Sequence, residues 1–189
     1  MTIAELMPPA AEPIALAAAK AHLRLDTSDE DELVSDLLRS ARTHLERETG
    51  LALISRSFRL YLDRWPDGRV IQIARGPVQT IENVTVYDGN GMPLDVALTG
   101  FVLDGTARPA RLVLADRPAP GQAANGIEID FTAGFGDSGV DVPDTLKRAM
   151  LIHVALMFEL RGAVDRGEQP AGVPAGYDRL VAPWRLRRL

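Results

Sequence analysis

The sequence predicts an α+β fold: a small helical bundle, an inserted antiparallel β sheet or sandwich, and an extended C-terminal tail. Two segments, at about 28–49 and 143–161, carry apolar residues at helical spacing. From about 53 to 133 the pattern instead alternates with a period of two, between turns rich in proline, glycine and asparagine. Several short strands joined by tight turns favour antiparallel pairing over a parallel α/β sheet.

The chain begins with two expected helices. The first is a short alanine-rich helix over about 15–24, and the second follows an acidic run. Asp26 or Ser28 is expected to cap the second helix, because both residue types accept backbone hydrogen bonds at helix starts. The apolar stripe of this helix comprises Leu33, Val34, Leu37, Leu38, Ala41 and Leu45. Gly50 provides its C-terminal stop.

The central region is expected to be built from strands. The candidates are 58–62, 70–73, 80–88 and 127–133, with two shorter ones at 101–103 and 111–114. The stretch "DGNG", which starts at Asp88, has the composition of a hairpin loop.

A last long helix is expected to open at Pro143, because proline is tolerated in the first turn. It is apolar nearly all round from Ala149 to Phe158, which predicts the central core helix, and Gly162 would end it. A glycine- and proline-rich linker and an arginine-bearing tail follow. The expected organisation is a helical core (1–52 and 140–162), an inserted β-rich region (53–139), and the linker with its tail (163–189).

Composition limits the functional classes. The 189 residues are 46% hydrophobic and 25% charged, the balance of a soluble globular domain. The absence of cysteine excludes disulfides, thiol catalysis and cysteine-ligated zinc, and suits a reducing cytoplasm. The N-terminus lacks the basic start of a secretory signal, and the longest apolar stretch, 149–158, is too short to span a bilayer. No membrane association is expected.

The glycines of "TAGFGDSG" (132–139) match the spacing G-x-G-x-x-G of a dinucleotide-binding turn. That chemistry needs the glycines directly between a strand and a helix within a βαβ unit. Here "VDVP" separates Gly139 from the helix, and Asp137 and Asp141 would face phosphates with the wrong charge. We interpret the glycines as relaxing a strand-to-helix connection. The echo of a serine-protease loop in "GDSG" lacks matching histidine and aspartate context.

No catalytic, cofactor-binding or metal-binding residues are predicted. The acidic run 26–32 lacks the glycine and the glutamate that a helix–loop–helix calcium site needs at its sixth and twelfth positions. His22, His44 and His153 show no metal-binding spacing. His153 lies in the most apolar helix, where a hydrogen-bonded core histidine is the expected role.

Charge is distributed unevenly along the chain. An acidic face is predicted at the start of the second helix, comprising Asp26, Asp29, Glu30, Asp31 and Glu32. The C-terminal tail combines apolar anchors with arginines, residue types that are common at interface hot spots. Such a tail can dock on a partner, touch nucleic acid or fold back on its own domain, and its position after a linker favours a partner. Its candidate docking residues are Tyr177, Leu180, Val181, Pro183, Trp184, Arg185, Leu186, Arg187 and Arg188.

The whole pattern resembles the head–tail connector (adaptor) proteins of long-tailed bacteriophages and gene transfer agents. The family's opening signature is matched by Leu16, Lys20, His22, Leu23, Arg24, the acidic run, Glu46, Thr49 and Gly50. Further matches are "RGPV" (75–78), "FTAGFG" (131–136), "VP" (142–143) and the alanine-rich last helix to Arg161. "LVAPWRLRR" (180–188) is similar to the family's closing L-x-P-Y-R, with Trp184 in place of tyrosine. The tyrosine often found near the end of the last helix is also absent, and Phe158 and Leu160 stand there.

This resemblance implies a structural protein of a virion or gene-transfer-agent particle, assembled in the bacterial cytoplasm, with no cofactor and no catalysed reaction. It implies a ring, commonly of twelve subunits, that stacks beneath the portal and is held by the C-terminal tail. The β-rich insertion would meet the next neck or tail protein, a stopper or tail terminator. DNA would pass through the ring without sequence-specific binding, which the net charge of −5 suits.

Three alternatives stay open at the level of sequence. The first is a stopper, a neck protein one layer lower. The second is a small ligand-binding or hydrolytic enzyme that uses His153 and the acids of the 134–141 loop. The third is a nucleic-acid-binding protein, whose binding by Arg185, Arg187 and Arg188 would depend steeply on salt.

Overall fold

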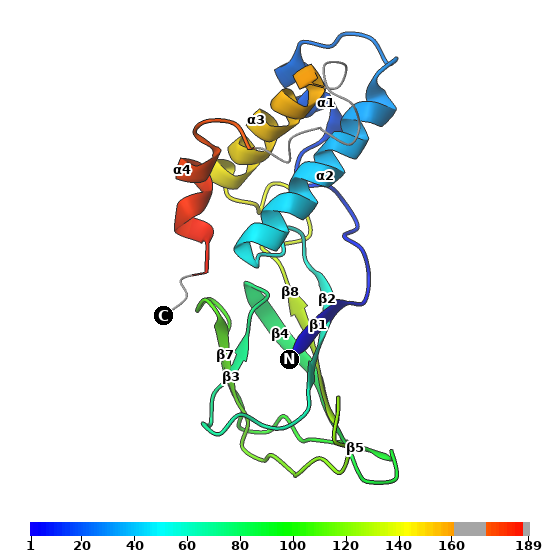
Figure 1. The fold of residues 1–189 in the computed structure, drawn as a ribbon, viewed down its shortest axis with the longest axis vertical. Helices are drawn as coiled ribbons and strands as arrows, with labels where there is room; N and C mark the ends of the chain where they lie inside the picture. Colours follow the sequence, from blue (N-terminus) through cyan, green and yellow to red (C-terminus); the bar gives the residue numbers. More distant parts are fainter. Residues whose placement is uncertain (161–172, 187–189) are drawn as a thin grey trace. The chain divides into compact units, whose positions relative to one another are not determined.

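The computed structural model describes residues 1–160 and 173–186, and Figure 1 shows the course of the chain. The chain divides into two compact units, each made from two separate segments. A β-rich unit comprises Met1–Ala10 and Ser55–Phe135, and a helical unit comprises Ala11–Ile54 and Gly136–Leu189. The fold class is therefore α+β, as the sequence predicted.

The larger sheet of the β-rich unit has five strands in the order β1-β2-β8-β4-β5, and every neighbouring pair is antiparallel. The strands are β1 (Thr2–Glu5), β2 (Arg56–Leu62), β4 (Val78–Tyr87), β5 (Pro93–Asp95) and β8 (Ile127–Ala133). The strands β2 and β8 alternate strictly between buried and half-buried residues, which is the structural counterpart of their period of two. Phe58 and Phe131 face each other across these strands with ring centroids 5.7 Å apart.

A smaller antiparallel sheet has the order β3-β7-β6. Its strands are β3 (Ile71–Ile73), β6 (Val102–Asp104) and β7 (Ala110–Val113). The predicted "DGNG" hairpin joins β4 to β5. The Asp88 carboxylate accepts hydrogen bonds from the backbone N–H groups of Asn90 (2.8 Å) and Met92 (2.9 Å), which closes the turn.

The sequence did not predict β1 and β5. Residues 1–10 were expected in the helical core, but β1 pairs with β2 in the register Ile3↔Leu60. This pairing joins residues far apart along the chain, and the strand is followed by two prolines that break any periodic pattern.

The helical unit contains four α-helices and a 3₁₀ turn within its described residues. They are α1 (Leu16–Leu23), α2 (Asp31–Thr49), α3 (Asp144–Leu160), α4 (Tyr177–Val181) and η1 (Ala182–Trp184). The helices α1 to α4 are labelled in Figure 1. The helix α2 packs on α3, α1 contacts both, and α4 packs on α3. The core stripe of α2 is Val34, Leu38, Ala41 and Leu45, as predicted apart from the half-buried Leu33 and Leu37.

Two details of the helices differ from expectation. The N-cap of α2 is Glu30 and makes no side-chain capping bond, because residues 28–31 form a turn closed by the Asp31 N–H on the Ser28 carbonyl. Asp26 and Ser28 therefore precede the capping position. The helix α3 is also less enclosed than predicted: it buries five residues, Leu146, Ala149, Met150, His153 and Val154, while Leu151, Ile152, Leu156, Met157 and Phe158 are half-buried.

Candidate assembly surfaces

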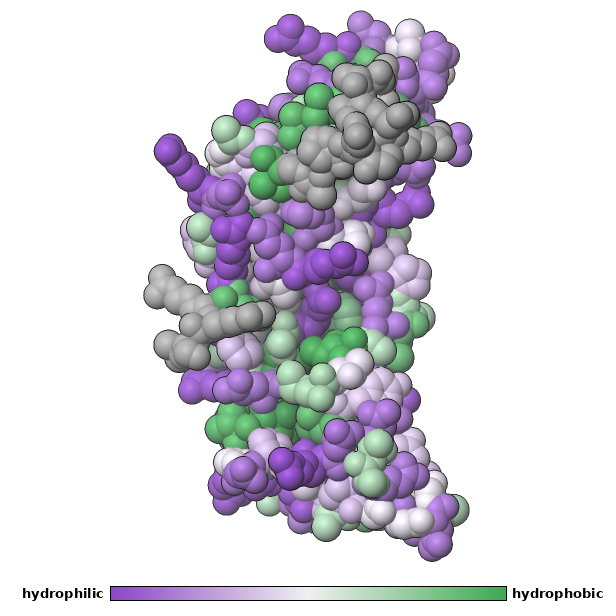
Figure 2. All heavy atoms as spheres, in the orientation of Figure 1, coloured by the Kyte–Doolittle hydropathy of each residue, from purple (hydrophilic) through white to green (hydrophobic). Residues whose placement is uncertain are grey.

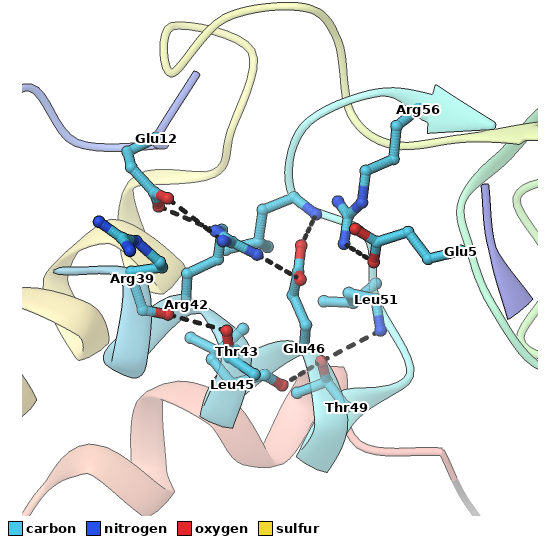
Figure 3. Close-up of polar contacts among 11 residues, drawn as sticks. Glu5, Glu12, Arg39, Arg42, Thr43, Leu45, Glu46, Thr49, Leu51 and Arg56 are labelled. Carbon is cyan, nitrogen blue, oxygen red and sulfur yellow. Dashed lines mark hydrogen bonds and ion pairs between the residues drawn. The ribbon is translucent and has the colours of Figure 1, made fainter. Parts of the chain in front are cut away.

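The end of α2 is held by a buried polar network, drawn in Figure 3. The Arg42 guanidinium donates to both carboxylate oxygens of Glu12 (2.8 and 3.2 Å) and to Glu46 (3.1 Å). Glu46 also accepts the backbone N–H of Leu53 at 2.8 Å. Arg42 and Glu46 are 7% and 4% exposed, so this network is shielded from water and each charge depends on its partner.

The next residues stop the helix. The Thr49 hydroxyl donates to the Leu45 carbonyl (2.7 Å) and accepts the Leu51 N–H (3.2 Å). Gly50 takes the left-handed conformation, with φ of 71°, and its N–H bonds the Glu46 carbonyl. The matched residues Glu46, Thr49 and Gly50 are thus structural, because they terminate α2 and hold the segment that follows it.

The predicted acidic face lies at the junction of α1 and α2. Asp26, Asp29 and Glu32 are exposed, whereas Glu30 and Asp31 are half-buried. Asp31 forms an ion pair with Lys20 of α1 at 2.5 Å. The remaining exposed carboxylates give this corner of the helical unit a negative surface.

The predicted docking tail is divided by the structure into a buried root and a more exposed end. Tyr177 and Val181 are both 0% exposed and pack within the helical unit. Arg185 donates to Glu48 of α2 (2.8 Å from Nε) and to Asp178. Pro183 is exposed, and Leu180, Trp184 and Leu186 are half-buried. Arg187 and Arg188 lie outside the described residues.

A cluster of rings forms where α4 meets the bundle. The rings of His44 and His153 are 5.0 Å apart, and Tyr177 lies 6.0 and 5.7 Å from them, all edge to face. Burial lowers the pKa of His153, and the neighbouring His44 lowers it further. Burial, and then the Glu48 carboxylate, raise the pKa of Tyr177. His153 is buried as expected, but its Nδ1 has no hydrogen-bond partner among the described residues.

Sequence reasoning did not foresee this cluster. His44, Glu48 and Tyr177 come from positions far apart in the chain, and the only signal was the helical spacing of His44 and Glu48 on α2. The side chains around His153 are His44 and Glu48 of α2 and Tyr177 of α4. The enzyme hypothesis instead required the acids of the 134–141 loop.

That loop has a structural explanation of its own. The Asp141 carboxylate accepts bonds from the backbone N–H (3.2 Å) and hydroxyl (3.0 Å) of Ser138. A Cβ on Gly136 would come within 2.3 Å of the Asp141 side chain, and one on Gly139 within 2.2 Å of the Pro13 carbonyl oxygen. The glycines therefore permit close packing, which agrees with their interpretation as a connection rather than a phosphate cradle.

Figure 2 shows one face, on which hydrophilic side chains predominate and apolar ones form small separate patches. In residues 1–160 and 173–186, no group of three or more His, Asp or Glu side chains is arranged to hold a metal ion. No helix in these same residues has the length and apolarity needed to cross a membrane.

Comparison with known proteins gives the family. A family profile described as "Phage gp6-like head-tail connector protein" matches residues 13–93, from α1 to the β4–β5 hairpin. The chain belongs to this family of head–tail connector proteins, and its role is that of a structural head–tail adaptor in the neck. Among curated protein sequences, none matches the chain significantly.

Solved structures extend the likeness over the full length. A chain from the neck of an empty gene transfer agent (GTA) particle, determined with C6 symmetry, is 32% identical with a TM-score of 0.82. This match covers 100% of the present chain and 97% of the other. A chain from the virion of a native gene transfer agent particle is 31% identical with a TM-score of 0.81. A chain from the neck of a native particle, determined with C12 symmetry, is also 31% identical, with a TM-score of 0.80. Both matches cover 100% of the present chain and 97% of the other.

Proposed function

We propose that copies of this chain close into a ring, of twelve subunits, beneath the portal of a gene-transfer-agent or phage particle, and that the ring joins the DNA-filled head to the tail. The observation that carries this proposal is the full-length likeness to a chain of a neck determined with C12 symmetry. The role is structural, and no reaction is assigned to the chain. Assembly would take place in the bacterial cytoplasm.

The C-terminal tail is the proposed link to the portal. Tyr177 and Val181 form its root and are buried in the helical unit. Arg185 donates a hydrogen bond to Glu48, which holds the tail against α2. The side chains proposed to contact the portal follow this root: Pro183, Trp184 and Leu186, and then Arg187 and Arg188, which lie outside the described residues. An anchored root restricts the freedom of Pro183 and Trp184 before binding, which reduces the ordering cost of docking.

The acidic face is proposed to contact the neighbouring subunit, and the β-rich unit to meet the next neck protein, a stopper or tail terminator. DNA would pass through the ring without sequence-specific contacts. The net charge of −5 supports this part of the proposal, because a negative wall repels phosphates and does not hold DNA in transit.

Native mass spectrometry of the purified chain, with and without the portal ring of the same particle, tests the proposal. A stoichiometric complex is expected, and it should be lost when residues 186–189 are removed. This truncation spares Tyr177, Val181 and Arg185, so the thermal unfolding midpoint should stay unchanged.

A charge-reversal pair provides a matched control. Arg187→Glu with Arg188→Glu should weaken the portal complex, whereas Arg64→Glu with Arg69→Glu, at exposed positions of the β-rich unit, should not. A complex that survives the truncation refutes tail docking. Absence of any complex with the full-length chain refutes the adaptor at this layer, and a complex with the tail-proximal neck protein alone identifies a stopper.

A further inference from the structure

The helical unit contains an open groove of about 840 Å³ that none of the functions above uses. It lies between the segment that leads into α1 and the first turns of α3. Its lining is mainly apolar and includes Ala15, Leu16, Ala18, Val140 and Leu151. Four charged residues also line it: Glu12, Asp144, Lys147 and Arg148. Glu12 is paired with Arg42, and Asp144 with Lys147, so the guanidinium of Arg148 is the lining charge that has no ion pair among the described residues.

The lip of this groove is held in place by the glycine loop. Gly139 packs on the Pro13 carbonyl, and the Ser138 hydroxyl donates a hydrogen bond to the Asp141 carboxylate. The Lys147 ammonium donates to the Gly139 carbonyl at 3.1 Å. These contacts present Val140 to solvent with 89% of its surface exposed. Val140 is the one large apolar residue of the helical unit, within residues described by the structure, that is this exposed.

Val140 lines the groove, so its exposed side chain is continuous with the apolar lining, and contiguous apolar patches on a protein surface mark interaction sites. The partial burial of α3 agrees with this, because Leu151 lines the groove and is only half-buried in one chain although the helix is apolar nearly all round.

We propose that this groove, with Val140 on its lip, receives the acidic face of a second copy of the chain, so that the pair forms the repeating contact of the ring. The inference rests on the proposed ring and names the surface opposite its acidic face. A ring requires two different surfaces that fit each other, because the contact runs head to tail from each subunit to the next.

Charge identifies the occupant. Arg148 is exposed at the groove and no ion pair with another described residue engages it, while Lys147 is already paired with Asp144 at 2.9 Å. The acidic face offers the exposed carboxylates of Asp29 and Glu32. The half-buried Leu25, just before the acidic run, provides an apolar side chain for the groove. The groove adjoins the N-terminal end of α1 and the acidic face follows its C-terminal end, so the two surfaces are distinct.

Two substitutions with matched controls test the contact in complexes with the portal ring, measured by native mass spectrometry. Val140→Asp and Arg148→Glu should each abolish the ring peak while the circular dichroism spectrum remains that of the wild type. The controls Val102→Asp and Arg69→Glu, at exposed positions of the β-rich unit, should leave the ring intact.

A charge swap tests the partner. Arg148→Glu combined with Asp29→Arg and Glu32→Arg should restore the ring, because the reversed charges again meet at each contact. Rings that persist in Val140→Asp and Arg148→Glu, rings lost equally in the controls, or a swap without rescue overturn the inference. Loss of portal binding from rings that stay closed would assign the groove to the portal and also overturn it.

The wild-type chain separates this inference from the proposed function. If the wild-type chain and the groove variants all form rings with the portal, the assignment of the groove is refuted and the proposed function stands. A wild-type chain that forms no ring with the portal rejects the proposed function, and the inference with it.

Discussion

Replacing Tyr177 by alanine should release the root of the C-terminal tail from the helical unit. Tyr177 is fully buried between His44 and His153, and a tyrosine buries about 150–250 Å², which at about 25 cal/mol per Å² corresponds to roughly 4–6 kcal/mol. Its hydroxyl is buried without a hydrogen-bond partner among the described residues, which offsets about 1–3 kcal/mol. We therefore expect a loss of about 1–5 kcal/mol in the docking of α4, with a central value of about 3 kcal/mol.

Hydrogen exchange measured by mass spectrometry reports this loss directly. About 3 kcal/mol corresponds to a factor of more than about 100 in an opening equilibrium. Peptides that cover residues 177–186 should exchange faster by that factor in Tyr177→Ala, whereas peptides of the β-rich unit should not change. The matched control is Tyr177→Phe, which keeps the ring and removes only the unpartnered hydroxyl, and its exchange should be no faster than that of the wild type. Unchanged exchange in Tyr177→Ala, or an equal effect in Tyr177→Phe, would refute the assignment of Tyr177 as the packing anchor.

Three further predictions concern the helical unit. Glu46→Ala leaves the buried Arg42 charge without one partner and the Leu53 N–H without its acceptor, so chemical denaturation should show a loss of about 3–5 kcal/mol, against no measurable loss for the exposed Glu32→Ala. Gly139→Ala places a methyl group 2.2 Å from the Pro13 carbonyl and should lower stability by about 1–3 kcal/mol, whereas Gly68→Ala, with no atom within 4 Å, should not. A stable Gly139→Ala protein would contradict the close packing of the loop. His153 has its pKa lowered from 6.5 in the folded chain, so the unfolded chain binds more protons and stability should fall as the pH drops below about 6.5. Urea unfolding between pH 7.5 and 5 should show this slope, and His153→Phe should reduce it; an unchanged slope would exclude His153 as its source.

The long elements could be predicted because their signals are local. The stripe from Val34 to Leu45 repeats at helical spacing, and Gly50 ends the helix in the only backbone region that favours glycine. The central strand β8 alternates over Ile127–Ala133, so its bounds could be predicted to the residue. Each of these features depends on side chains close together in the chain.

The features that sequence reasoning missed depend on distant partners. The edge strands β1 and β5 are short, and Ile3 becomes part of a strand only because Leu60 lies opposite. The predicted cap of α2 was wrong because the turn at 28–31 shifts the start of the helix. Helix propensity does not decide between these two local hydrogen-bond patterns. The burial of α3 was overestimated because the apolar pattern indicates which side chains favour burial, but it does not specify how completely the rest of the chain covers them.

The sequence by itself determined the α+β class, the long helices, the acidic run at 26–32 and the likeness to connector proteins, since these follow from periodicity, charge and matched residues. Only the tertiary structure decided that the root of the tail is an anchor, that His44, His153 and Tyr177 form one cluster, and that the glycine loop presents Val140 beside an apolar groove. The reason is physical: contacts such as Tyr177 with His44, or Gly139 with Pro13, form between residues more than a hundred positions apart, and local propensity does not specify them.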